Sequence, residues 1–109
     1  MRRGLEIEVL DWGVELRIAG RLDSRSSPAA RTSLHEQVDG ADGDLTVNLA
    51  DAEIWDGAGL GVLVGTSRRA RRAGRRLVLT EVCPRELRML RVARVPRTAL
   101  VRPALLPAG

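Results

Sequence analysis

The segment from Glu53 to Ala73 constrains the fold more than any other part of the chain, because an acidic turn and three spaced glycines lead into an apolar helical repeat. Apolar or small residues recur at the i, i+3, i+4 and i+7 spacing of one helical face. They are Leu60, Leu63, Val64, Ser67 and Ala70. Arginines fill the last turns, where positive charge suits the helix dipole, and Gly74 stands where a left-handed glycine ends a helix. The pattern predicts a helix from Gly59 to Ala73.

Strands are predicted where apolar and polar residues alternate. Residues 5–9 and 14–18 alternate in this way on the two sides of the turn-forming residues 11–13, so they predict a β-hairpin. Residues 45–49 alternate as well, and the short apolar run 77–79 is typical of a buried strand. The chain therefore contains several short strands with helical patterns between them.

Two more helices are predicted on either side of this central helix. Ser27 is a capping residue followed by Pro28 at the first helical position, and that helix ends before Gly40. Pro84 starts a third helix, and Pro96 ends it. Strands that alternate with helices imply parallel crossovers. The predicted fold class is therefore α/β, with a mixed sheet of four to five strands and three main helices packed on it.

The length of the chain, 109 residues, suits one domain with one small core. We expect a single domain over residues 1–100 and a loose tail over residues 101–109, where Pro103 and Pro107 disfavour regular structure. No apolar run approaches the roughly 18 residues of a membrane span, and the N-terminus lacks the apolar stretch of a signal peptide. The lone Cys83 fits a reducing compartment. A cytoplasmic location is expected.

Charge is distributed unevenly along the chain. Residues 1–67 hold 6 Arg against 12 Asp and Glu, whereas residues 68–109 hold 12 Arg against 2 Glu, so the balances are −6 and +10 and sum to +4. A basic half can bind phosphates. However, Trp12 and Trp55 are the only aromatic residues, and neither lies among the arginines, so the stacking platform of a nucleic-acid binder is absent. No direct contact with nucleic acid is predicted.

The sequence gives little support to an enzyme, a metal site or a cofactor site. His35 is the only histidine, and Cys83 the only cysteine, so neither belongs to a recognisable catalytic or metal-binding cluster. The acidic loop 39–44 lacks the ligand spacing of a calcium-binding EF-hand, and the glycine-rich segment 57–61 lacks the lysine of a P-loop. We predict a non-enzymatic protein with no catalytic residues, no metal and no cofactor.

Residues 56–63, Asp-Gly-Ala-Gly-Leu-Gly-Val-Leu, resemble the Asp-Ser-x-Gly-Leu-Gly-x-Leu signature of the bacterial anti-sigma factor antagonists, which belong to the STAS domain family. Residues 20–23, Gly-Arg-Leu-Asp, are similar to the Gly-Glu-Leu-Asp turn of the family, which is also followed by a polar stretch and a helix. Length and element order agree from about Leu5 to Val95. The resemblance implies a STAS-like fold and a protein contact at the start of the central helix.

The resemblance also implies a switch that this chain lacks. The phosphoacceptor of the family is the hydroxyl residue directly after the aspartate, which is Gly57 here, and the next position is Ala58. In the family, the unphosphorylated antagonist binds a kinase-fold anti-sigma factor and frees the sigma factor, whereas phosphorylation adds negative charge and breaks the contact. Thr66 and Ser67 lie too far along the helix to replace the acceptor. We therefore predict no phosphoacceptor and no switching at the usual site.

We expect the partner to contact the outward face of the central helix and the loop after Leu22. With Leu60, Leu63, Val64 and Ser67 turned inward, small outward residues would let a partner backbone approach closely. The resemblance implies the same region and a structural or electrostatic role for the two aspartates near the helix start. The candidate contact residues are Asp23, Ser24, Asp56, Gly57, Ala58, Gly59, Gly61, Val62, Gly65 and Arg69. Glycine as the helix cap should cost roughly a few tenths of a kcal/mol relative to serine.

Three functions remain open at this point. The first is an antagonist that binds an anti-sigma factor of the serine-kinase type and releases a sigma factor. The second is a STAS accessory subunit of another protein machine, such as a transporter ATPase, which needs no acceptor. The third is a nucleotide-binding regulatory module, because a helix N-terminus can accept phosphate. A homodimer is also left open.

Overall fold

Within residues 4–105, five strands form one mixed sheet in which neighbours follow the order of the chain, β1-β2-β3-β4-β5. The computed structural model describes residues 4–105. The strands are β1 (Glu6–Asp11), β2 (Glu15–Leu22), β3 (Leu45–Ile54), β4 (Leu77–Val82) and β5 (Ala99–Pro103). β1 runs antiparallel to β2, and every other neighbouring pair is parallel. Parallel neighbours need crossover connections, so the helices between these strands follow from the topology. The predicted α/β class and mixed sheet are confirmed.

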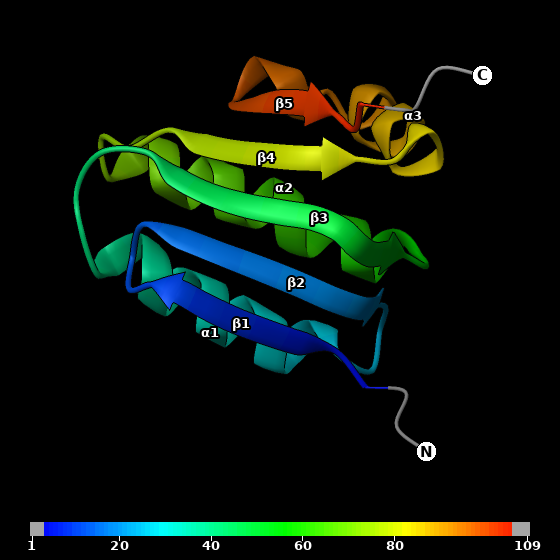
Figure 1. Cartoon of the computed structure of the whole chain (residues 1–109), viewed down its shortest axis with the longest axis horizontal. Helices are drawn as coiled ribbons and strands as arrows, with labels where there is room; N and C mark the ends of the chain where they lie inside the picture. The colour runs from blue at the N-terminus through cyan, green and yellow to red at the C-terminus, as the bar shows by residue number, and fades with distance from the viewer. Residues whose placement is uncertain (1–3, 106–109) are drawn as a thin grey trace.

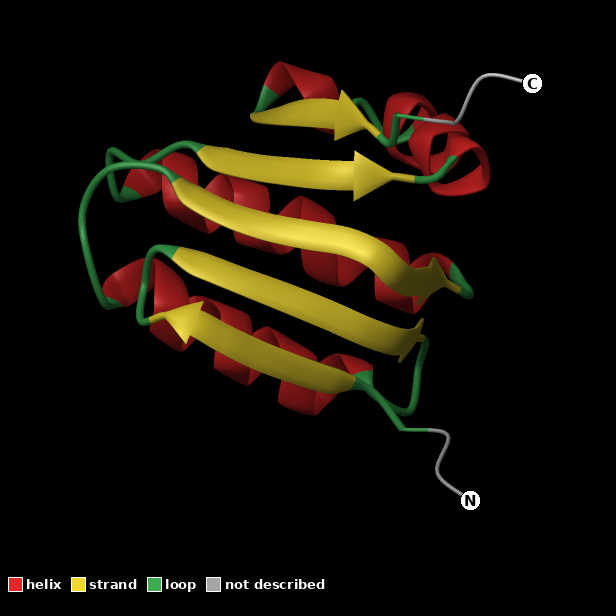
Figure 2. Ribbon diagram, in the orientation of Figure 1, coloured by secondary structure: helices red, strands yellow, loops and turns green. Residues whose placement is uncertain are grey.

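The helices are α1 (Ser27–Asp39), α2 (Gly57–Arg72) and α3 (Pro84–Val92), followed by the short 3-10 helix η1 (Val95–Arg97). α1 and α2 lie side by side on one face of the sheet, while α3 and η1 lie beside β4 and β5 (Figures 1 and 2). The opposite face carries no helix within residues 4–105 (Figure 2). Within the same residues, no helix has the length and apolar character needed to cross a bilayer.

The core lies between the sheet and the two long helices. β2 shows the alternation that its sequence predicts, because Leu16, Ile18 and Leu22 are fully buried while Glu15 and Arg21 are exposed. Burial of each such aliphatic side chain contributes roughly 1.5–3 kcal/mol, which holds α1 and α2 against the sheet. The other large side chains that are fully buried are Leu34, Leu45, Leu49, Ile54, Leu63, Leu77, Leu79, Leu90 and Val38.

The boundaries of the elements correct three predictions. The central helix starts at Gly57 rather than Gly59, although Gly74 has the expected left-handed conformation with φ +73°. Ser27 is the first residue of α1 and not its cap, because its hydroxyl donates to the carbonyl of Asp23 instead of closing the helix. The loose tail was predicted to begin at residue 101, but residues 101–103 belong to β5. Residues 106–109 lie outside the described part of the chain.

Candidate functional site

Asp56 joins the start of α2 to the loop between β2 and α1. It has an extended backbone with φ −152° and caps the helix, because its Oδ1 accepts the N–H of Gly59 at 2.9 Å. Its Oδ2 accepts the N–H of Ser24 at 3.0 Å. One carboxylate therefore fixes both segments that the sequence predicted to lie together. The cap is this aspartate and not Gly57, so the expected cost of a glycine cap does not arise.

Asp23 has a different role, because it shapes its own loop. Its Oδ1 accepts the N–H groups of Ser26 at 3.0 Å and of Arg25 at 2.9 Å. These hydrogen bonds, that of Ser26 first, hold the pKa of the Asp23 carboxyl below its usual value. The hydroxyl of Ser26 donates to the carbonyl of Arg21 at 2.7 Å and closes the turn. The loop thus presents a fixed backbone beside the start of α2.

Several of the predicted contact positions form an open surface at the start of α2. Gly57, Ala58, Gly61 and Ser24 are exposed, and Gly65 is half-buried. A Cβ atom at residue 57, 61 or 65 would meet no other atom within 4 Å. The packing of this protein therefore does not require glycine at these three positions. They leave a shallow surface that a partner can approach closely.

Gly59 and Val62 are buried, so the prediction that they contact a partner is wrong. A Cβ atom at residue 59 would lie 1.9 Å from the carbonyl oxygen of Leu22, which means that this glycine allows α2 to pack directly on β2. Val62 and Thr66 are at most 1% exposed. α2 contacts both the sheet and α1, and this widens its buried face beyond the single stripe assumed from the sequence.

Arg69 forms an ion pair with Asp39 within the molecule. Its guanidinium donates from Nε to Asp39 Oδ1 at 3.2 Å and from Nη2 to Asp39 Oδ2 at 2.7 Å. This bidentate pair joins α2 to the end of α1, and it holds the pKa of the Asp39 carboxyl below its usual value. Arg69 therefore links the two helices, and its contact with a partner stays a prediction.

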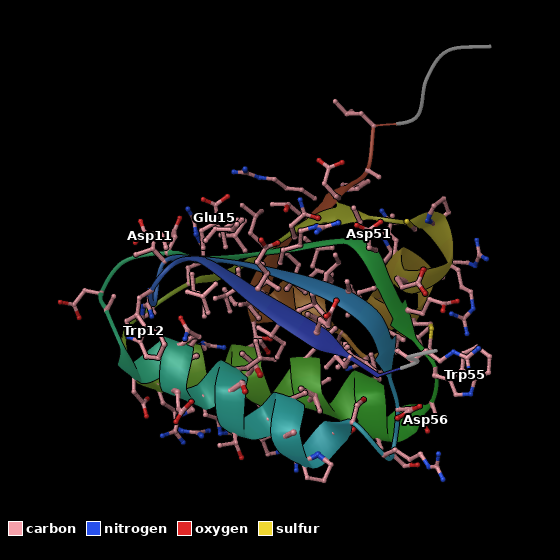
Figure 3. The ribbon with its side chains drawn as sticks, turned by 60° about the horizontal axis from the view of Figure 1, so that its bottom comes forward. Asp11, Trp12, Glu15, Asp51, Trp55 and Asp56 are labelled. Carbon is pink, nitrogen blue, oxygen red and sulfur yellow. The ribbon has the colours of Figure 1, made fainter. Side chains whose placement is uncertain are left out.

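Trp55 is a surface residue of this site that the sequence argument missed. It is 48% exposed, precedes Asp56, and lies at the opposite end of the molecule from Trp12 (Figure 3). The Arg21 guanidinium carbon lies 4.0 Å from the centre of its ring, which is a cation–π contact. The backbone N–H of Trp55 donates to the carbonyl of Leu22 at 2.9 Å. An exposed tryptophan in a chain with 2% aromatic residues was the available signal.

α3 supports the strand that carries Trp55. Glu86 is buried, and its Oε2 accepts the N–H of Ile54 at 3.3 Å and an N–H of the Arg85 guanidinium at 2.8 Å. The same guanidinium nitrogen donates to the carbonyl of Ile54 at 3.0 Å. The end of β3 is thus held on both sides, by β2 and by α3. No cluster of three or more metal-binding side chains occurs within residues 4–105.

The comparison with known families agrees with this fold and site. Residues 10–106 match the family described as "Mlab, STAS domain". The chain therefore belongs to the STAS domain family. Within it, the chain is similar to the anti-sigma-B factor antagonist of Bacillus subtilis (strain 168), with 31% identity over 90 residues that cover 82% of this chain and 81% of that protein. The predicted resemblance to the anti-sigma factor antagonists is confirmed.

Solved structures show the same fold at low sequence identity. The anti-sigma factor antagonist SpoIIAA in its unphosphorylated form has a TM-score of 0.69 and 17% identity, over 90% of this chain and 87% of that one. An anti-sigma-factor antagonist (STAS) domain protein from Planctomyces limnophilus has a TM-score of 0.69 and 14% identity, over 94% and 92% of the two chains. SpoIIAA has also been solved in its phosphorylated form.

Proposed function

We propose that this protein is an anti-sigma factor antagonist that binds an anti-sigma factor of the serine-kinase type and thereby releases a sigma factor. The contact surface is the start of α2 together with the loop between β2 and α1. The observation that carries the proposal is the open surface at Gly57, Ala58 and Gly61, which Asp56 fixes against Ser24. The similarity to the antagonist from Bacillus subtilis supports the same class of function. Such a protein acts in the cytoplasm as a regulator and not as an enzyme.

The proposed antagonist is not switched at the position that the family uses. Gly57 and Ala58 carry no hydroxyl. Thr66 and Ser67 are buried, and their hydroxyls donate to the carbonyls of Val62 at 2.7 Å and of Val64 at 2.8 Å. These two hydroxyls are therefore inaccessible to a kinase. Ser24 is the exposed hydroxyl residue on the facing loop, so a phosphorylation test must include it.

Capture of the partner tests this proposal. The immobilised protein is passed over lysate of its own source, and the retained proteins are identified. Gly61→Glu is the disruptive variant, because it adds a charged side chain in open space on the proposed surface. Thr32→Glu adds the same charge on the exposed side of α1 and is the matched control. Retention of a kinase-fold anti-sigma factor by the wild type and by Thr32→Glu, but not by Gly61→Glu, is the expected result.

Two other results would assign the protein a different function. Retention of a transporter ATPase in place of an anti-sigma factor would assign the chain as an accessory subunit, a role that the missing hydroxyl also permits. A rise in melting temperature with ATP or GTP, absent in Gly61→Glu, would indicate the nucleotide-binding module. Membership of the STAS family is independent of all three outcomes.

A further inference from the structure

The exposed large apolar side chains within residues 4–105 gather mainly at two edges of the sheet. Four of them, at 38–58% exposure, lie in or beside the β1–β2 hairpin, and two more belong to α3 and to the segment after β5. The hairpin set is Val9, Leu10, Trp12 and Val14. The other set is Val92 at the end of α3, 84% exposed, and Leu105, two residues after the end of β5. Grouped apolar side chains on a surface are typical of a protein contact.

The two sets carry opposite charge. Residues 4–16 contain four acidic residues and no basic residue, whereas residues 87–105 contain five arginines and no acidic residue. Asp11 and Glu15 beside the hairpin set make no ion pair within the described residues. The same holds for the five arginines, which are Arg88, Arg91, Arg94, Arg97 and Arg102. We call these surfaces the acidic hairpin patch (residues 9–15) and the basic edge patch (residues 88–105).

The two patches cannot meet within one molecule. β1 and β5 are the two edge strands of the sheet, and the hairpin and α3 lie at opposite corners of it (Figure 1). The contact that each patch would form is therefore available on another copy of the chain. We infer that this protein associates head to tail, with the acidic hairpin patch of one molecule against the basic edge patch of the next. Such a contact leaves one patch free at each end, so the assembly is open-ended.

A symmetric contact between two hairpins fits the charges less well. Antiparallel pairing of two β1 edges would bring one acidic strand, with Glu6, Glu8 and Asp11 and no basic residue, beside an identical acidic strand. Like charges that face each other across strands destabilise the pair. The head-to-tail arrangement instead puts carboxylates against guanidinium groups and apolar side chains against apolar side chains.

The acidic hairpin patch is held in position by the body of the protein. Gly13 is buried at the turn, and its N–H donates to Gln37 Oε1 at 2.6 Å while its carbonyl accepts from the Arg75 guanidinium. Trp12 packs over Gly40, where a Cβ atom would lie 2.6 Å from the indole nitrogen. A surface that is already ordered loses little entropy on binding. The hairpin can therefore dock without rearrangement.

Sedimentation velocity over a range of protein and salt concentrations tests the inference. The sedimentation coefficient of the wild type should rise with concentration and fall back at high salt, because exposed charges are screened. The double variant Asp11→Arg/Glu15→Arg disables the acidic hairpin patch. Arg88→Gln/Arg91→Gln weakens the basic edge patch by neutralising it, so that the reversed hairpin charge of the first variant gains no new partner. Each variant alone should be a monomer. Circular dichroism and melting temperature confirm that each remains folded.

Mixing the two variants gives the decisive result. Each retains the patch that the other has lost, so an equimolar mixture should form a dimer with one copy of each and should stop there. A wild type that stays monomeric at every concentration would overturn the inference. So would a mixture that stays monomeric, or a single variant that still associates. Wild-type protein that binds an arginine-rich peptide but not itself would assign the acidic patch to a different, basic partner.

Discussion

At the scale of single residues, the glycines within residues 56–63 have different structural roles. Gly59 permits the direct contact of α2 with β2, whereas Gly61 faces open space. Gly59→Ala should destabilise the protein by about 1–3 kcal/mol or more, because the helix must move away from Leu22. Gly61→Ala is the control, and it should stabilise the protein by up to about 1 kcal/mol, since alanine favours helix. Urea unfolding monitored by circular dichroism measures both changes, and equal effects would contradict this distinction.

Gly57 lies at the position where the family resemblance implies a phosphoacceptor, and a side chain there would project into open space. Gly57→Ser should therefore change stability by no more than about 0.5 kcal/mol. Once the partner kinase has been captured, it should phosphorylate Gly57→Ser with ATP but not the wild type, as intact-mass spectrometry would show. Phosphorylation of the wild type that disappears in Ser24→Ala would mean that the facing loop has taken over the switch.

At the scale of secondary-structure elements, the sequence predicted the types and order of the elements but not the directions in which side chains point. Periodicity located α2 within two residues of its observed start, yet it assigned Val62 to the surface. The period of a helix cannot indicate that two neighbours pack against it, and here α2 contacts both α1 and the sheet. β5 was missed for a related reason, because Pro103 suggested a tail, although an edge strand tolerates proline.

The sequence predicted the arrangement of the candidate site only for segments that belong to a recognised family motif. The aspartate before the helix and the loop after Leu22 were expected to lie together, and the structure places them within hydrogen-bond distance. The separate roles of Asp23 and Asp56, and the pairing of Arg69 with Asp39, depend on distances between elements that no local pattern contains. Contacts made across the fold are therefore the part that sequence reasoning could not supply.

Arg75 joins several elements at the end of the molecule opposite the candidate site. Its buried guanidinium donates to the carbonyls of Gln37 at 3.0 Å, Val38 at 2.9 Å and Gly43 at 2.8 Å. Arg75→Leu would leave buried carbonyls without donors and should destabilise the protein by about 3 kcal/mol or more. Arg76→Leu, which removes an exposed and solvent-screened ion pair with Asp44, should destabilise the protein far less than Arg75→Leu does. Comparable losses in chemical denaturation would show that the buried network contributes little.

At the scale of the whole molecule, folding lowers the pKa values of several aspartates and of His35, and each of these shifts makes the protein less stable as pH falls. Burial, followed by the positive charges of Arg69 and Arg31, lowers the pKa of His35 in the folded state. Hydrogen bonds lower the pKa of Asp23, and the Arg76 guanidinium does the same for Asp44. In each case the unfolded chain binds protons more tightly than the folded protein. Stability must therefore rise as pH rises through the range where these groups titrate.

Two separate losses of stability on acidification follow from these signs. The first begins as pH falls through about 6.5, where His35 of the unfolded chain takes up a proton that the folded protein resists. The second begins below about pH 4, as the exposed aspartates become protonated and lose their hydrogen bonds and ion pairs. The melting temperature should therefore fall between about pH 7.5 and pH 5.5 in the wild type, and it should fall less in His35→Gln. Both proteins should lose stability in parallel below about pH 4, since the aspartates are unchanged. Identical melting curves of wild type and His35→Gln between neutral pH and pH 5.5 would show that folding does not lower the pKa of this histidine.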